Sequence, residues 1–283
     1  MAGRHWGSDD DRETDRHNIP DQIMDNHVLL QKPKQESLVA HGKVPIDPAL
    51  NVFFTLDDLR VGKRMPIYFP SKSGDPSKSP RLLTREQSDS IPFSSAQLSH
   101  LLSFFSIPEG SSQAKAMEYT LKQCELEPIA GETRFCAASL ESMLDSAREL
   151  FGPKAQFRVL TTTYLPSKKK AGDDPLQNYT ILQAPQQIDA TRVIGCHTMP
   201  YPYAVFYCHS QAQSENRVYQ ISLGSGSRED GGVETSVEAV AVCHMDTTLW
   251  DRDHVSFRVL GVEPGRSPVC HFFPADNLVW VAS

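Results

Sequence analysis

Apolar residues are distributed in three different ways along the chain. Residues 1–50 carry almost no periodic apolar pattern, and charged residues, Asn and His dominate the first 27. Between Ser94 and Phe151, apolar residues recur every three or four positions, as in amphipathic helices. From Phe157 onward, short β-branched and aromatic runs separated by turn residues predict strands. This order predicts a flexible arm over residues 1–50 and one α+β domain over residues 51–283, with its helical part first and a β-rich C-terminal half.

Three helices are expected in the first half of the domain. The first begins after Ser94 or Ser95 and ends near Phe105, and the second begins after Ser111 or Ser112 and ends near Cys124. The third is expected from near Arg134 to Phe151, where Gly152 and Pro153 end it. Its inward positions are Cys136, Leu140, Met143, Leu144 and Leu150.

A short strand ending at Pro70 precedes the helices, and a loop over Ser71–Pro80 follows it. Later strands are expected in the segments FRVLTTTYL, YTILQAP, TRVIGCH, YAVFYCH, RVYQISLG, VEAVAVCH, VSFRVLGV, PVCHFF and LVWVAS.

Four Cys-His dipeptides are the most distinctive pattern in the chain. Their gaps are 10, 33 and 25 residues, and Trp280 follows eight residues after the last pair. The dipeptides are Cys196-His197, Cys208-His209, Cys243-His244 and Cys270-His271.

Neighbouring side chains on a strand point to opposite faces, so each Cys faces one way and its His the other. If the cysteines form disulfides, they hold the strands together on one face, and a stiff backbone presents the histidines on the other. That arrangement would preorganise a metal site or an active site. Two alternatives stay open: structural disulfides beside incidental histidines, and a Cys2His2 zinc site, which needs free thiolates.

Six cysteines with none left over indicate a disulfide set and an oxidising compartment. Cys124 and Cys136 close a loop of 11 residues and are expected to pair, whereas the four Cys-His cysteines allow three pairings. The polar N-terminus does not resemble a signal peptide, so we expect that a leader is missing from this chain.

The net charge of −7 and pI near 5.8 argue against nucleic acid as a partner, because no basic patch dominates. The basic run Ser167–Lys170 is expected to be a solvated loop. The sequence has no run of 18 apolar residues, so it predicts no membrane-spanning helix. We expect a monomer.

The Cys-His spacing resembles that of the plant BURP domain, and the resemblance extends from about residue 50 to the end of the chain. Further matching segments are FFTLDDLRVGKRMPIYFP, IPFSS, CELEPIAGETRFCAASLESM, YPYAVFYCH, AVAVCHMDTTLW and PVCHFFP. One departure is the 33-residue gap between the second and third pairs, where the family usually has about 25. The extra length falls in Gly224–Gly232, which predicts the tip of a surface hairpin.

The resemblance implies a BURP-domain fold and a function. Some BURP proteins are copper-dependent, autocatalytic peptide cyclases that use dioxygen to crosslink a Trp or Tyr side chain of a core peptide. The resemblance then implies two Cu(II) ions at His197, His209, His244 and His271, and a secreted or vacuolar location. Other family members resemble non-enzymatic cell-wall or seed proteins, including a polygalacturonase-associated class, and this is the alternative function.

Four further residues are candidates near such a site. His254 lies where the family tends to have His, and could be a metal ligand, a base beside one or a surface residue. Tyr203 and Tyr207 share a strand face with His209 by parity and could line a substrate groove or pack in the core. Asp246 follows His244 by two residues and could orient an imidazole.

The sequence contains no core peptide of the expected kind, an octapeptide from Gln to Trp or Tyr. Before Tyr68, the only Trp or Tyr is Trp6, and no Gln precedes it. The core peptide is therefore expected in a removed N-terminal part or in another chain, unless this member is not a cyclase.

Overall fold

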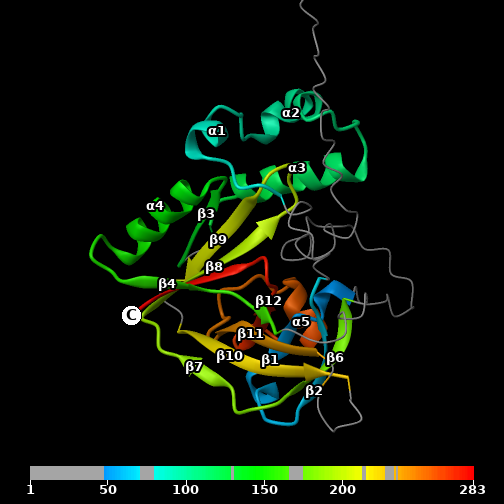
Figure 1. The fold of residues 1–283 in the computed structure, drawn as a ribbon, viewed down its shortest axis with the longest axis vertical. Helices are drawn as coiled ribbons and strands as arrows, with labels where there is room; N and C mark the ends of the chain where they lie inside the picture. The colour runs from blue at the N-terminus through cyan, green and yellow to red at the C-terminus, as the bar shows by residue number, and fades with distance from the viewer. Residues whose placement is uncertain are drawn as a thin grey trace, which may run out of the picture.

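Two antiparallel sheets lie against each other, and most of the helical chain is on the outer side of one of them (Figure 1). The computed structural model describes residues 48–70, 80–128, 131–165, 175–211, 215–226, 233 and 235–283. The smaller sheet has the strand order β3 (Glu132–Ala137), β9 (Val205–Gln211), β8 (Arg192–Met199), β13 (Leu278–Ala282) and β4 (Phe157–Leu160).

The larger sheet is built around the long hairpin of β10 (Asn216–Ser225) and β11 (Thr235–His244). Its main path is β1-β12-β11-β10-β6-β2, while β5 pairs with β11 and β7 pairs with β10. The remaining strands are β1 (Phe53–Thr55), β2 (Arg64–Tyr68), β5 (Thr163–Tyr164), β6 (Leu176–Ile181), β7 (Gln186–Ile188) and β12 (Val269–Phe273).

Side-chain hydroxyls cap the helices that the sequence predicts. Ser111 accepts a hydrogen bond from the Ala114 N–H at the start of α3, and Ser139 accepts one from the Ser142 N–H at the start of α4. Gly152, with φ of 99°, ends α4. The helices are α1 (Arg85–Asp89), α2 (Leu98–Phe104), α3 (Ser112–Glu125), α4 (Leu140–Phe151) and α5 (Val255–Leu260), with 3-10 turns η2 (Pro48–Leu50), η3 (Leu56–Asp58) and η5 (Ser95–Gln97).

The expected start of the third helix near Arg134 is wrong. Residues 132–137 form β3, which pairs with β9 along its whole length, and α4 begins only at Leu140. Sheet pairing satisfies these backbone groups, and Ser139 then fixes the point where the helix begins. Cys136 therefore points from a strand, and Leu140 is 46 % exposed, whereas Met143, Leu144 and Leu150 pack inward as expected.

The expected strand in VSFRVLGV is also wrong, because Val255–Leu260 is the helix α5. The His254 side chain accepts a hydrogen bond from the Ser256 N–H, and Gly261 ends the helix in the left-handed conformation. These two end signals favour a helix, although the short alternation of apolar residues alone predicts a strand.

Several sequence predictions fall wholly or partly outside the described residues: most of the arm, the loop Ser71–Pro80, the basic run Ser167–Lys170 and the tip of Gly224–Gly232. Gly224 itself still belongs to β10, so the hairpin that carries the extra length is present. Ala49 and Leu50, placed in the arm by the sequence analysis, are buried against Tyr68 and Val255.

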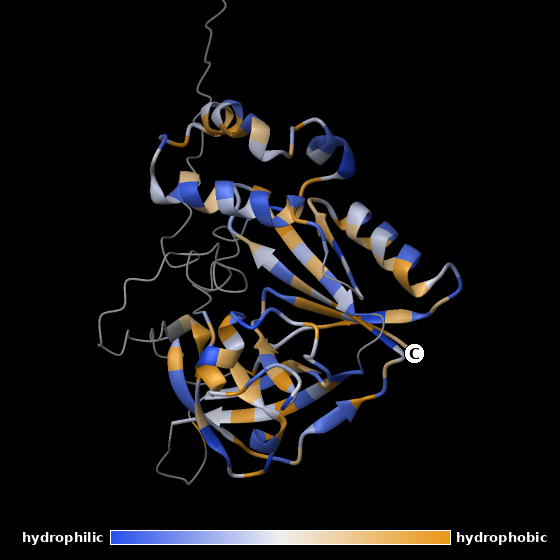
Figure 2. Cartoon of the chain, turned by 180° about the vertical axis from the view of Figure 1, so that it is seen from behind, coloured by the Kyte–Doolittle hydropathy of each residue, from blue (hydrophilic) through white to orange (hydrophobic). Residues whose placement is uncertain are grey.

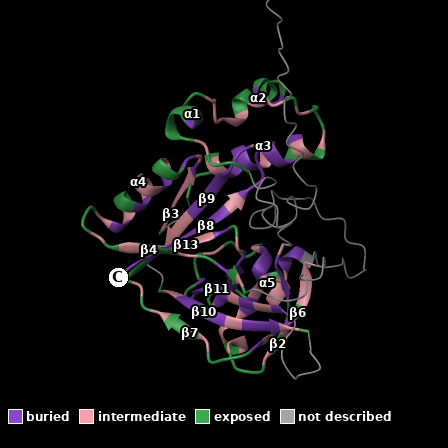
Figure 3. Cartoon of the chain, in the orientation of Figure 1, coloured by how far each residue is buried: buried purple, intermediate pink, exposed green. Residues whose placement is uncertain are grey.

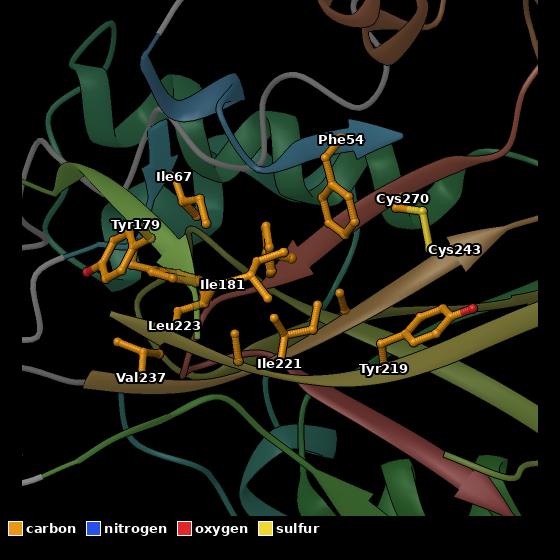
Figure 4. Packing of buried hydrophobic residues seen from close by; sticks show 14 residues of the cluster. Phe54, Ile67, Tyr179, Ile181, Tyr219, Ile221, Leu223, Val237, Cys243 and Cys270 are labelled. Atoms are coloured by element: carbon orange, nitrogen blue, oxygen red, sulfur yellow. A yellow bond between two sulfur atoms is a disulfide. The ribbon is translucent and has the colours of Figure 1, made fainter. Parts of the chain in front are cut away.

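Each sheet has an apolar cluster on both of its faces. Hydrophobic positions recur along the strands, with polar ones between them (Figure 2). Buried positions concentrate on β8, β9, β11, β12 and β13 (Figure 3). A valine-rich layer that includes Phe273 lies between the two sheets. Beyond it, the larger sheet encloses a cluster with Phe54, Ile221 and Phe272 (Figure 4), and α4 covers the outer face of the smaller sheet.

All six cysteines form disulfides, as predicted. The structure also shows which of the three possible pairings the four Cys-His cysteines adopt. Cys124–Cys136 ties α3 to β3, while Cys196–Cys208 joins β8 to β9 and Cys243–Cys270 joins β11 to β12. The last two bridges link residues directly opposite each other in register, with Cα–Cα distances of 4.0 and 3.9 Å.

We predict that replacing Cys243 and Cys270 together with Ala lowers the free energy of unfolding by about 2–5 kcal/mol, because the unfolded chain regains the freedom of the closed loop. Urea unfolding without reductant measures this loss. The matched variant lacking Cys124 and Cys136 should also be less stable, but only the first variant should disturb the imidazole NMR signals of His244 and His271. A loss below about 0.5 kcal/mol would contradict the prediction.

Candidate functional site

The four Cys-His histidines meet in one cluster between the two sheets. His197 and His209 come from β8 and β9 of the smaller sheet, and His244 and His271 come from β11 and β12 of the larger one. In each sheet the two cysteines face each other across the strands, so their histidines lie diagonally on the opposite face. The separation of sulfur and imidazole onto two faces follows from strand alternation, as predicted.

Each sheet contributes one close pair of imidazoles. The Nε2 atoms of His197 and His209 are 3.3 Å apart, and those of His244 and His271 are 3.4 Å apart. The pairs also contact each other, with ring centroids 5.4 Å apart for His197 and His271 and 6.0 Å apart for His209 and His244. The cluster is therefore continuous across the gap between the sheets.

Three of the four histidines are almost inaccessible to solvent. His197, His244 and His271 are 4, 3 and 6 % exposed, whereas the His209 side chain is 17 % exposed. Solvent or a small ligand therefore reaches the cluster most easily beside His209.

Phe273 and Gly195 shape the floor of the cluster. The Phe273 ring stacks on His197 and tilts against His271, at 4.7 Å from each. Gly195 pairs with His209 in register, and a Cβ atom there would lie 2.9 Å from Cζ of Phe273 and 3.5 Å from Nε2 of His209. The absence of a side chain at position 195 lets Phe273 and His209 occupy their places.

Three histidines have a polar partner at Nδ1. The Asn277 amide nitrogen lies 3.4 Å from Nδ1 of His197, and Oε1 of Glu132 lies 3.6 Å from Nδ1 of His209. Oε1 of Gln211 lies 3.3 Å from Nδ1 of His244. Such partners fix the orientation of an imidazole ring and leave Nε2 pointing into the cluster.

Burial keeps His244 and His271 neutral. It lowers the pKa of His271 to about 3, and the neighbouring His209 and His254 lower it further. Burial, followed by the proximity of His271, also places the pKa of His244 well below 6.5. Neutral imidazole is the form that binds metal ions.

A small cavity lies between His209 and His244, with a volume of about 10 Å³, close to the space that one water molecule needs. Gln211 and Asn216 also line it, and Oδ1 of Asn216 is buried without a hydrogen-bond partner. The cavity therefore offers an acceptor to a small polar molecule next to both histidine pairs.

His254 lies one aromatic ring away from the cluster. Trp250 packs between His244 and His254, with centroid distances of 4.9 and 4.7 Å, and Phe53 lies about 6 Å from both His254 and His271. Burial, followed by the proximity of His209, lowers the pKa of His254 to about 4. Its Nδ1 lies 2.7 Å from the Ser256 hydroxyl, so that side of the ring serves the start of α5.

The other sequence candidates lie around the cluster rather than in it. Tyr203 and Tyr207 are buried in the apolar cluster under α2 and α3, although the Tyr207 ring is 5.8 Å from His209. Asp246 is exposed on the turn after β11, where it accepts hydrogen bonds from the backbone and side chain of Thr248.

Sequence reasoning missed the residues that orient the histidines. Asn277, Glu132 and Gln211 belong to segments far from one another in the chain, and no spacing pattern links them to the Cys-His pairs. Gly195 did carry a signal, because glycine inside a strand often marks a close approach of another group.

The geometry of each pair fits a shared metal ion. Two nitrogens about 2.0–2.1 Å from one ion at a tetrahedral angle are about 3.3 Å apart. Throughout the described ranges, however, no three His, Cys, Asp or Glu side chains already converge as a metal site. The cluster thus offers two nitrogens for each ion, and other ligands would complete the coordination. In the described part of the chain, every helix is too short or too polar to cross a bilayer.

We predict that Gly195→Ala lowers the free energy of unfolding by about 1–3 kcal/mol, because the new methyl group overlaps Phe273. Adding Phe273→Leu should restore part of that stability, since a shorter side chain leaves room for the methyl group. Chemical denaturation of the wild type, both single variants and the double variant checks this. Additive losses in the double variant would count against the packing explanation.

The pH dependence of stability should report the buried histidines in metal-free protein. Their folded-state pKa lies below the unfolded value near 6.5, so the unfolded chain binds more protons in acid. The contribution of each such group to the free energy of unfolding is therefore fully present above pH 6.5. It falls between pH 6.5 and about 3, by about 1.4 kcal/mol per pH unit. Urea midpoints across this range should fall less steeply for His271→Gln than for wild type, whereas exposed His100→Gln should leave the slope unchanged. Equal slopes for all three proteins would refute the burial effect.

The comparisons with known proteins agree with the pattern of the site. The family model described as BURP domain matches residues 52–282. BURP domain-containing protein BNM2A of Brassica napus is 46 % identical over 236 residues, covering 83 % of this chain and 81 % of that protein. BURP domain protein USPL1 of Arabidopsis thaliana is 45 % identical over 235 residues, with the same coverage.

Protein RAFTIN 1B of Triticum aestivum is 40 % identical over 230 residues, covering 81 % of this chain and 59 % of that protein. These names describe a domain or a protein, and none states a reaction. The match over nearly all of residues 52–282, together with the four Cys-His pairs, shows that the chain belongs to the BURP-domain family of plants.

Proposed function

We propose that this chain is a copper- and dioxygen-dependent peptide cyclase, which oxidatively crosslinks a Trp or Tyr side chain within a ribosomally made core peptide. One observation carries the proposal: two pairs of imidazoles, held by two sheets, meet in a single buried cluster. Rigid nitrogen ligands of this kind suit copper better than Mg²⁺ or Ca²⁺.

In this proposal each pair holds one ion, one at His197 and His209 and one at His244 and His271, which the close Nε2–Nε2 distances support. Zinc at the cysteines does not fit, because all six sulfurs are in disulfides. Disulfides also indicate an oxidising compartment, which agrees with a copper protein of the secretory pathway, in the vacuole or outside the cell.

Bound copper, reoxidised by dioxygen, would supply the oxidising power that removes two hydrogen atoms from the peptide. The chain contributes position and environment. Phe273 and the valine layer keep water away from three of the imidazoles, and the more exposed His209 marks the side from which a substrate side chain approaches. Glu132 and Gln211 orient their histidines through Nδ1.

The proposed substrate is a core peptide, in the same precursor or in another chain. A tether raises its effective concentration at the site and so offsets weak binding. We assign that tether to the polar arm of residues 1–50, which directly precedes the domain. Nucleic acid and membranes are not proposed partners, and the protein is expected to act as a monomer.

The alternative is a non-enzymatic secreted cell-wall or seed protein of the BURP family, of the polygalacturonase-associated type. It is favoured by the absence of a core octapeptide in the sequence. In that case the imidazole cluster would be a structural element between the sheets, and copper would be dispensable.

Copper loading is the first test. The protein should bind about two Cu(II) per chain, with nitrogen couplings in its electron paramagnetic resonance spectrum, and His244→Ala should lose about one ion. Exposed His100→Gln is the matched control and should load like the wild type. Failure to bind copper in any form, or binding of zinc through thiolates, would overturn the metal assignment.

Activity is the second test. A Gln-to-Trp octapeptide grafted onto the N-terminus should lose two hydrogens in mass after incubation with Cu(II) and oxygen. Ala at His197, His209, His244 or His271 should abolish the change, while deletion of residues 227–232, the part of the insertion that follows β10, should matter little. An unchanged core mass in protein with copper shown to be bound would favour the cell-wall or seed protein.

A further inference from the structure

The two histidine pairs differ in the groups that hold their outer nitrogens. We infer that they are unequal metal sites, and that Asn277 is the positioning residue that makes them so. The inference rests on the proposed function for the role of the metal, but the imidazole tautomers on which it depends belong to the metal-free protein.

The orientation of the Asn277 amide is fixed by its neighbours. Asn277 is 1 % exposed, and its Oδ1 accepts a hydrogen bond of 2.9 Å from the Thr198 backbone N–H. A backbone N–H can only donate, so it must face the amide oxygen rather than the amide nitrogen. Nδ2 of Asn277 therefore faces Nδ1 of His197, at 3.4 Å.

This contact sets the tautomer of His197. An amide NH₂ group only donates, so Nδ1 of His197 must accept, and the ring proton of neutral His197 is on Nε2. That Nε2–H then donates to Nε2 of His209, 3.3 Å away, and leaves the proton of His209 on Nδ1, toward Glu132. A directed chain of donors thus runs from Asn277 through His197 to His209, whose Nδ1 faces a carboxylate oxygen of Glu132 at 3.6 Å.

The second pair differs at its outer nitrogens. Oε1 of Gln211 lies 3.3 Å from Nδ1 of His244, so a proton on Nδ1 is favoured and the Nε2 lone pair accepts from Nε2–H of His271. His271 must also move its ring proton before its Nε2 can bind an ion. Against the lowering by burial, however, a hydrogen bond with the Phe272 backbone raises the pKa of His271, so a backbone acceptor rather than a donor faces that ring.

A metal-bound histidine usually donates its other N–H to an oxygen acceptor. Nδ1 of His244 has such an acceptor at 3.3 Å, and Nδ1 of His209 faces a carboxylate oxygen at 3.6 Å. Nδ1 of His197 faces the donating NH₂ of Asn277 instead.

An ion can bind Nε2 of His197 only after the ring proton has moved to Nδ1. There it would face the donating NH₂ of Asn277, unless the amide rotates and gives up its bond to Thr198. Either outcome leaves a buried donor unpaired, which weakens binding. The first copper ion should therefore occupy His244 and His271, and the second should bind His197 and His209 more weakly.

The tautomers can be read directly from metal-free protein. Nitrogen-15 NMR of the imidazole rings should show the proton on Nε2 of His197 and on Nδ1 of His244. A proton on Nδ1 of His197 would overturn the inference, whatever copper does.

Copper titration tests the consequence. Calorimetry should show two affinities in the wild type, with the tighter one lost in His244→Ala and the weaker one lost in His197→Ala. Asn277→Asp keeps an acceptor for Thr198 and places a second acceptor at Nδ1 of His197, so it should tighten the weaker site by about 10–100-fold. Asn178→Asp, on an exposed position of β6, adds the same charge away from the cluster and should change neither affinity.

These outcomes distinguish a failure of the copper proposal from a failure of the role given to Asn277. Two equal affinities, a first ion at His197, or no effect of Asn277→Asp would overturn the inference while leaving the copper proposal standing. Predicted tautomers in a protein that binds no copper would refute the proposed function and uphold the assignment of Asn277.

Discussion

The alternation of side chains along four strands is the constraint on which this protein depends. In β8, β9, β11 and β12, adjacent Cys and His residues must point to opposite faces. Because the cysteines lie opposite each other in register, each disulfide fixes the offset between two strands, and that offset fixes the diagonal approach of the two imidazoles. A slip of one residue in either pair would send the histidines to the wrong face.

Placing polar rings between two sheets carries an energetic cost that the surroundings reduce. The rings stack on Phe273 and on one another, so much of their surface contacts apolar or aromatic groups. Their nitrogens face one another or an outer polar group, which meets the requirement that buried polar atoms be hydrogen bonded. The same burial that disfavours charge keeps the nitrogen lone pairs available.

The local pattern predicted the elements that have strong end signals or strong periodicity. Ser111 and Gly152 mark helix ends, and the strands with Cys-His pairs lie where alternation predicts them. The start of α4 after Ser139 and the helix α5, with its end signals at His254 and Gly261, were not predicted, because a short apolar run suits a strand or a helix. Residues 132–137 become a strand because β9 is beside them, which no local signal reveals.

The histidines of the site could be predicted from the sequence, but the residues that orient them could not. The four histidines could be predicted because each of them directly follows a cysteine in the chain. Their partners at Nδ1 depend on which loop ends meet the cluster after folding, and tertiary contacts alone determine that. The pairing of the cysteines was equally open until the register of the strands was known.

The direct adjacency of sulfur and imidazole in the chain has a consequence for biosynthesis. Cys243–Cys270 joins residues 27 positions apart, and Cys196–Cys208 joins residues 12 positions apart, so the smaller ring can close while the rest of the chain is still being made. Oxidation of each bridge brings its two histidines to their final spacing as a by-product. The cluster itself is complete only when β11 and β12 lie against β8 and β9, because each sheet supplies one histidine pair.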